Sequence, residues 1–109
     1  MSVWVMLSTA GSIREANRIA KQMVKEKLAA CVTVLSGATS HFFWEGKLCR
    51  EREAVIIAKT SGGNARKIIN KIKEMHSYQV PEVLFFKADL GEKKYSDWVE
   101  NTVRKKRKS

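Results

Sequence analysis

The sequence predicts a single α+β domain in which helices cover one face of a β-sheet. At 109 residues the chain has room for one domain and little more. Short apolar runs rich in β-branched residues alternate with longer segments in which apolar residues recur at helical spacing. Apolar residues make up 44% of the chain, which is ordinary for a folded domain and too high for a disordered one.

The first third of the chain predicts a strand, a capped helix and a second strand. Residues 3–8 form a short apolar run that is typical of a buried strand. Ser12 and Glu15 have the spacing of a capping box, in which the serine accepts from a helical amide and the glutamate reaches back. Apolar residues at helical spacing follow over residues 13–28. Residues 28–35 predict a second buried strand, which the next two residues, a Ser-Gly pair, bring to an end.

Two strands joined by a tight turn are predicted next. They cover residues 39–45 and 47–59, and Gly46 suits the turn because glycine readily adopts positive φ. These arms are longer than a small four-stranded sheet needs. We therefore expect the hairpin to overhang its own sheet.

The remaining segments predict a helix, a strand and a last helix. A glycine-rich break ends at Asn64, a candidate helix cap, and an amphipathic helix follows over residues 65–75. Residues 82–88 predict a strand and residues 95–103 a final helical stripe. Two strand–helix–strand units indicate crossovers onto one sheet with helices on one face. The simplest arrangement is a ferredoxin-like sandwich with an extra C-terminal helix.

Aromatic residues near the hairpin tip predict a partner. Side chains alternate along a strand, so Phe42 and Trp44 point one way and Phe43 the other. One helical layer covers only one face of a sheet, and large apolar patches rarely stay exposed. A second copy of the chain is expected to cover the other face. The alternative is that these aromatic side chains pack within their own subunit.

The charge and the cysteine content limit the classes of protein to which the chain can belong. The net charge is +10, and residues 104–108 carry five of the positive charges. Such a run is typical of a nucleic-acid or lipid-binding tail, and equally of a solvated tail that suits a helix C-terminus. Cys31 and Cys49 lack metal-binding or redox spacing, which favours reduced thiols in a cytoplasmic protein. No apolar run reaches the roughly 18 residues of a membrane span, so no membrane partner is expected.

Seven short motifs occur in order along the chain. They are Leu28-Ala29-Ala30-Cys31-Val32, Gly37-Ala38-Thr39-Ser40, Trp44-Glu45-Gly46-Lys47, Glu53-Ala54-Val55, Lys59-Thr60, His76-Ser77-Tyr78-Gln79-Val80-Pro81-Glu82 and Tyr95-Ser96-Asp97-Trp98-Val99. In identity, order and spacing these motifs resemble those of the CutA (divalent-cation tolerance) family. The resemblance implies a ferredoxin-like domain over residues 1–103 and a homotrimer whose hairpins pair between subunits. The basic tail over residues 104–109 lies outside the resemblance. The resemblance also implies a role in tolerance of divalent cations, copper above all, and no established reaction.

The chain departs from the family pattern at several positions. Ser77 and Ser36 stand where the family usually has proline. Some bacterial relatives have a cysteine and a His-His pair that are suggested copper ligands, and the matching residues here are Ser8, Met75 and His76. His76 is the one strong ligand kept, and Met75 is a weak thioether donor for Cu(I). Copper or another divalent metal is therefore the cofactor that the resemblance suggests.

The candidate binding site is a cleft between subunits, where the hairpin of one copy reaches the segment after the second helix of another. Its predicted lining residues are Trp44, Glu45, Glu53, His76, Tyr78 and Glu82. Imidazole, phenol and carboxylate groups can do acid–base work if they converge, or they can hold a loop by hydrogen bonds. No nucleophile–base pair and no glycine-rich phosphate motif is present, so no enzymatic activity is predicted.

Two other functions are alternatives. A regulator similar to PII-type signalling trimers would take a small anionic ligand in the subunit clefts, attracted by basic residues there. A nucleic-acid-binding module would use the basic charge of the chain. Residues 54–58 offer no aromatic ring on which a base could stack, which argues against nucleic acid as a partner.

Overall fold

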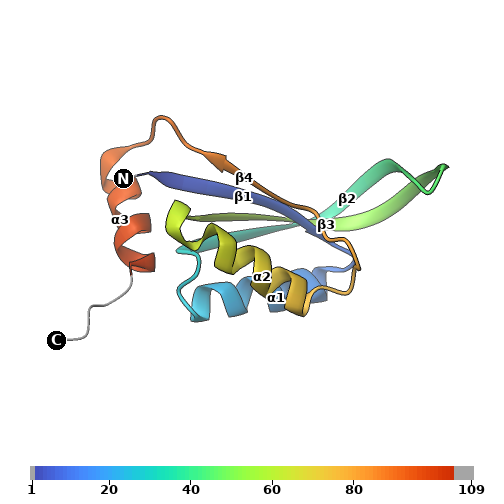
Figure 1. Ribbon diagram of the computed structural model, residues 1–109, viewed down its shortest axis with the longest axis horizontal. Coiled ribbons are helices and arrows are strands. Elements are labelled where there is room, and N and C mark those ends of the chain that lie inside the picture. Colours follow the sequence, from blue (N-terminus) through green and yellow to red (C-terminus); the bar gives the residue numbers. More distant parts are fainter. Residues whose placement is uncertain (1, 105–109) are drawn as a thin grey trace.

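Four antiparallel strands form one sheet in the computed structural model of the protein, which describes residues 2–104 (Figure 1). The strands are β1 (Val3–Ala10), β2 (Cys31–Trp44), β3 (Lys47–Ser61) and β4 (Val83–Lys87), and their order in the sheet is β2-β3-β1-β4. The helices are α1 (Ile13–Lys25), α2 (Ala65–Met75) and α3 (Lys93–Val103), and a single 3-10 turn, η1 (Gly62–Asn64), precedes α2. The predicted tail at 104–109 lies outside the described residues except for Arg104.

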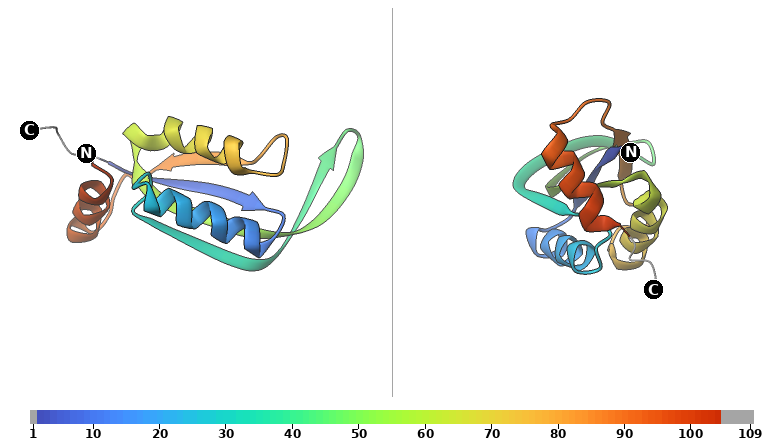
Figure 2. Two further views of the ribbon diagram at one scale, coloured as in Figure 1. Left: turned by 90° about the horizontal axis from the view of Figure 1, so that it is seen from below. Right: turned by 90° about the vertical axis from the view of Figure 1, so that its left-hand side faces the viewer.

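The main core lies between the sheet and the two helices α1 and α2, which lie side by side on one face (Figures 1 and 2). Its largest fully buried side chains are Met6, Ile19, Met23, Ile56, Ile68 and Ile72. Fully burying a side chain of this kind contributes about 1.5–3 kcal/mol. Helix α3 lies at the far end of the sheet, where Val99 and Val103 pack with Val3 and Ala30. None of the described helices is long and apolar enough to cross a membrane.

The two predicted helix caps have different outcomes. Ser12 caps α1 as predicted, because its Oγ accepts a hydrogen bond of 3.1 Å from the backbone N–H of Glu15. The Glu15 carboxylate instead binds Ser77, in the segment after α2. Asn64 occupies the N-cap position of α2 as predicted, but its side chain makes no cap bond to the helix. The Asn64 amide donates to the carbonyl oxygens of Leu28 (3.2 Å) and Val103 (3.5 Å) and so links α3 to the sheet region.

One bulged strand replaces two of the predicted strands. Residues 28–35 and 39–45 were expected to be separate, but β2 runs unbroken from Cys31 to Trp44. Leu35 pairs with Val55 and Ala38 with Glu53, so β2 advances three residues while β3 advances two. A β-bulge absorbs the extra residue and allows the strand to continue. Because side chains alternate, the residues at 38, 40, 42 and 44 face the same side of the sheet as those at 31, 33 and 35.

The hairpin overhangs the sheet, as the sequence predicts. Residues 54–61 of β3 pair with β1, whereas residues 47–53 pair with β2 alone. Figure 1 shows this part of the hairpin extending beyond the sheet and the helices. Glu45 (φ 51°) and Gly46 (φ 77°) form the two-residue turn, and both have the positive φ that such a turn requires.

The face of the sheet opposite α1 and α2, called here the open face, is apolar. Its side chains alternate with the buried ones, and its exposed or half-buried apolar members are Val5, Leu7, Leu35, Val55, Ile57, Leu84 and Phe86. Phe42 and Trp44 continue this face onto the overhanging hairpin because the bulge shifts the alternation of β2. On the other side of the hairpin, Phe43 and Leu48 are cross-strand partners and are 75% and 74% exposed. The single chain therefore leaves large apolar surfaces uncovered.

Candidate functional site

The predicted site residues gather where the hairpin leaves the sheet. A cleft of about 880 Å³ lies there, and we call it the hairpin cleft. Four of the six predicted residues line it: Trp44, Glu53, Tyr78 and Glu82. Glu45 lies in the turn at the hairpin tip, outside the lining, and His76 is buried behind it. The hairpin and the 76–82 segment of one and the same chain therefore form this cleft.

Tyr78 links the segment after α2 to the base of the hairpin. Its hydroxyl donates a hydrogen bond of 2.9 Å to Oε2 of Glu53. Burial raises the pKa of Tyr78, and the hydrogen bond to Glu53 and the negative charges of Glu53, Glu51 and Glu15 raise it further, to about 12. The phenol consequently stays protonated at neutral pH and acts as a hydrogen-bond donor.

His76 is held by backbone groups on both sides of its ring. Its Nε2 lies 2.6 Å from the carbonyl oxygen of Thr9, to which it donates, and its Nδ1 accepts from the N–H of Tyr78 at 2.9 Å. This pair of bonds assigns the neutral tautomer with hydrogen on Nε2. The ring is buried, so a metal ion could bind either nitrogen only after one of these bonds had broken.

Glu15 fixes the next residue of the same segment to α1. Its carboxylate accepts from the backbone N–H of Ser77 at 2.6 Å and from the Ser77 hydroxyl at 3.0 Å. Burial alone would raise the pKa of Glu15, but the two hydrogen bonds from Ser77 act against burial, and the pKa is lowered. Arg18 adds a bond of 3.1 Å from Nη2 to the carbonyl oxygen of Met75.

The soft metal ligands of the sequence do not converge in one chain. The Met75 side chain packs against the main core, and Cys31 is half-buried on β2. Cys49 lines the hairpin cleft, where its Sγ lies 3.6 Å from the carbonyl oxygen of Lys47. Across residues 2–104 no group of three or more His, Cys, Asp or Glu side chains is arranged to hold a metal ion. The donors of a single chain therefore do not fit a closed metal site, which needs three or four converging ligands.

Sequence reasoning missed ten of the fourteen residues that line the cleft, among them Glu51 and Phe42. Glu51 lines the cleft beside its cross-strand partner Ser40, and Phe42 lines it beside its cross-strand partner Cys49. The signal was present in the alternation of β3, because Glu51 lies two residues from Glu53 and so faces the same side. The same alternation places Phe42 on the side of Trp44, which was predicted to line the cleft.

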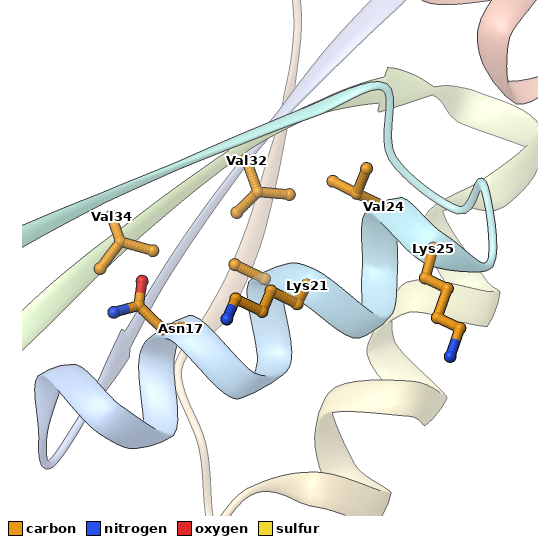
Figure 3. A pocket seen from close by; sticks show the side chains of 7 residues that line it. Asn17, Lys21, Val24, Lys25, Val32 and Val34 are labelled. Atoms are coloured by element: carbon orange, nitrogen blue, oxygen red, sulfur yellow. The ribbon is translucent and has the colours of Figure 1, made fainter.

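A second hollow, of about 510 Å³, lies between α1 and β2. Figure 3 shows Val32 and Val34 of β2 directed toward α1, with Asn17 and Lys21 on the helix below them. None of the predicted site residues lies there, and the lining contains no carboxylate and no thiol. We therefore take the hairpin cleft as the candidate functional site.

The fold and the cleft together define a small α+β protein with a protruding hairpin and a polar and aromatic cleft at the hairpin base. The sequence model described as "CutA1 divalent ion tolerance protein" matches residues 4–102. The chain belongs to this family.

Named relatives share most of their length with the chain. The "Divalent-cation tolerance protein CutA" of Yersinia pestis (strain Pestoides F) is 42% identical over 95 residues, which are 87% of this chain and 80% of the relative. CutA1 from Oryza sativa has a TM-score of 0.93 at 32% identity and covers 97% of each chain. A protein from Archaeoglobus fulgidus, described as the periplasmic divalent cation tolerance protein CutA, has a TM-score of 0.90 at 36% identity and covers 94% of this chain and 99% of its own.

Proposed function

We propose that the chain forms a homotrimer of ferredoxin-like subunits that acts in the response to divalent metal ions, copper above all. In this proposal the protein is cytoplasmic and not an enzyme, and it binds a metal ion or a small ligand in clefts that its subunits share. Membership of the divalent ion tolerance family supports the metal response. The sheet order β2-β3-β1-β4, with α1 and α2 on one face, supports the ferredoxin-like description of the subunit.

The uncovered apolar surface is the observation that carries the proposal. The open face and the hairpin expose large side chains, among them Leu84, Phe86 and Trp44. Contiguous apolar surface of this kind marks a protein interface, and burying it against copies of the same chain would remove it from water. Because the hairpin cleft lies at the edge of this surface, assembly would bring groups of a second copy to the cleft.

A shared metal site also explains why one chain lacks a ligand cluster. A closed site needs three or four converging donors. The described residues of one chain contain no such group of His, Cys, Asp or Glu side chains. Cys49 and the carboxylates of the cleft could each contribute to a site that a second copy completes.

Calorimetric titration of the assembled protein with Cu²⁺ and Zn²⁺ tests this proposal. We expect saturable binding with a stoichiometry tied to the assembly, and a higher melting temperature in the presence of the bound ion. Glu53→Gln and Cys49→Ser should weaken binding, whereas Glu74→Gln, on α2 away from the cleft, should not. Ion binding that is unaffected by the first two variants would contradict a site in this cleft.

The cleft does not favour the two alternative functions. Glu51, Glu53 and Glu82 line it against the single guanidinium of Arg52, so it offers little attraction to a small anion. No aromatic ring projects from residues 54–58, so this part of the central strand β3 offers no stacking surface to a base. Nucleotides and short RNA belong in the same thermal-shift panel, and we expect neither to raise the melting temperature.

A further inference from the structure

We propose that the hairpin cleft binds an organic ammonium cation, of the polyamine or quaternary ammonium class. The carboxylates of the cleft would hold the charge, and the aromatic rings would contact the carbon atoms. This inference deepens the proposed function, because it names a ligand class for the same cleft. All the residues that it uses line the cleft within one chain.

Charge is the first observation behind this inference. Three of the eleven acidic residues of the chain, Glu51, Glu53 and Glu82, line this one cleft. Arg52 is the only Lys or Arg in the same lining, although the chain as a whole has a net charge of +10. The negative potential is already felt inside the cleft, where the charges of Glu53 and Glu51 add to burial in raising the pKa of Tyr78. A cation is therefore the ligand that this surface attracts.

The arrangement of aromatic rings is the second observation. On the cleft side of the hairpin, Ala38 pairs with Glu53, Ser40 with Glu51 and Phe42 with Cys49, so carboxylates and rings lie on one face at successive positions. Trp44 follows on the same face, and Tyr78 lines the cleft from the segment after α2. The face of an aromatic ring attracts a cation within about 6 Å of its centre, and quaternary ammonium groups are recognised by such rings.

The spacing of the carboxylates suits an organic cation. Glu51 and Glu53 lie two residues apart on β3, which places their Cα atoms about 7 Å apart along the strand. One oxygen of Glu53 also accepts a hydrogen bond from Tyr78. A polyamine, whose charges are spread along a carbon chain, can meet separated carboxylates and lie against the rings between them.

Calorimetric titration of the full chain with spermidine and with tetramethylammonium chloride tests the inference. Titrations at constant ionic strength, with KCl as the reference salt, remove the effect of screening. We expect saturable binding of both cations. Glu51→Gln should weaken spermidine binding about threefold, which is a typical loss for one exposed charge pair. Phe42→Leu, which keeps the apolar contact and removes the ring, should weaken tetramethylammonium binding more than spermidine binding.

Glu74→Gln is the matched control, since it removes the same charge from the exposed face of α2. Equal weakening by Glu51→Gln and Glu74→Gln would show attraction to net charge alone and overturn the inference. Equal responses to KCl and to the two ammonium salts would overturn it as well. If Cu²⁺ or Zn²⁺ binds and neither ammonium does, the inference fails and the proposed metal response stands. If both ammonium cations bind and neither metal ion does, the inference stands and the metal response fails.

Discussion

Three consecutive residues after α2 each tie a different element to this segment. The His76 ring bonds to Thr9 at the end of β1, and Ser77 bonds to Glu15 of α1. The Tyr78 hydroxyl bonds to Glu53 of β3. Each of these contacts joins residues at least 25 positions apart in the sequence. The sequence could show that these polar groups cluster along the chain, but their partners follow only from the tertiary fold.

Replacement of Ser77 tests the strength of this attachment. Ser77→Pro removes both hydrogen bonds to Glu15, because proline has no N–H and no hydroxyl, whereas Ser77→Ala removes only one. His76 is already extended, as a residue before proline prefers, so little backbone strain is added at that position. We expect Ser77→Ala to lower the free energy of unfolding by about 1 kcal/mol and Ser77→Pro by more, measured by urea denaturation. Equal stability of Ser77→Pro and the wild type would contradict this account.

The same contact predicts a dependence of stability on acid. The pKa of Glu15 is lowered in the folded protein from its ordinary value of 4.5. Its contribution to the free energy of unfolding is therefore fully present above about pH 4.5 and is lost as the pH falls through the folded pKa. Glu15→Gln should remove this part of the acid dependence, as followed by urea denaturation at several pH values. An unchanged acid profile in the variant would count against the bonds from Ser77.

Tyr78 predicts a corresponding effect in alkali. Its pKa is raised to about 12, so its contribution to stability is present below the unfolded value of 10.0 and is lost as the pH rises through about 12. In a spectrophotometric titration, the wild type should show a tyrosine that ionises near pH 12 and that is missing in Tyr78→Phe. If the titration of Tyr78→Phe matched that of the wild type near pH 12, the bond from Tyr78 to Glu53 would not exist in solution.

At the scale of elements, apolar periodicity predicted the helices α1, α2 and α3 and the strands β1, β3 and β4 to within a few residues. It failed at β2, where a Ser-Gly pair looks like a strand end. Pairing with β3 on both sides of the bulge keeps the strand continuous, and a partner strand is information that a local pattern lacks. Asn64 is the N-cap residue of α2, but its amide bonds to carbonyl groups of distant segments, which a local pattern could not show.

The bulge gives a test at this scale. Gly37 has φ of 81°, and no atom lies within 4 Å of the position that an alanine methyl group would take, so Gly37→Ala would add backbone strain and no clash. We expect it to cost about 1–2 kcal/mol of unfolding free energy. Gly63→Ala is the matched control, since its surroundings are equally open and its φ is not in the left-handed region. A Gly37→Ala protein as stable as Gly63→Ala would contradict the bulge geometry.

At the scale of the whole molecule, the sequence predicted the overhanging hairpin and its exposed aromatic residues. The sequence predicted only part of the cleft lining. Glu51 and Phe42, for example, line the cleft because of how β2 and β3 pair. Glu45 was expected to line the cleft and lies instead at the hairpin tip, since the two-residue turn separates it from the cleft wall. The surface left open by the single chain is the feature from which the proposed assembly follows.

Replacement of Trp44 by alanine tests whether the uncovered apolar surface is an interface. Trp44 on the hairpin and Trp98 on α3 are similarly exposed, at 51% and 48%. Large aromatic anchors dominate interface energies, so Trp44→Ala should weaken assembly, whereas Trp98→Ala should leave it intact if α3 lies outside the interface. Sedimentation velocity of the two variants at equal concentrations measures the difference. Assembly of the Trp44→Ala protein equal to that of wild type would exclude the hairpin as the anchor.

The molar mass of the wild-type protein in solution tests the central claim most directly. Light scattering coupled to size-exclusion chromatography, repeated over a dilution series, gives this mass without a shape assumption. The account predicts three times the mass of one chain, because the open face and the hairpin are covered only by other copies. A particle with the mass of a single chain at all concentrations would contradict it.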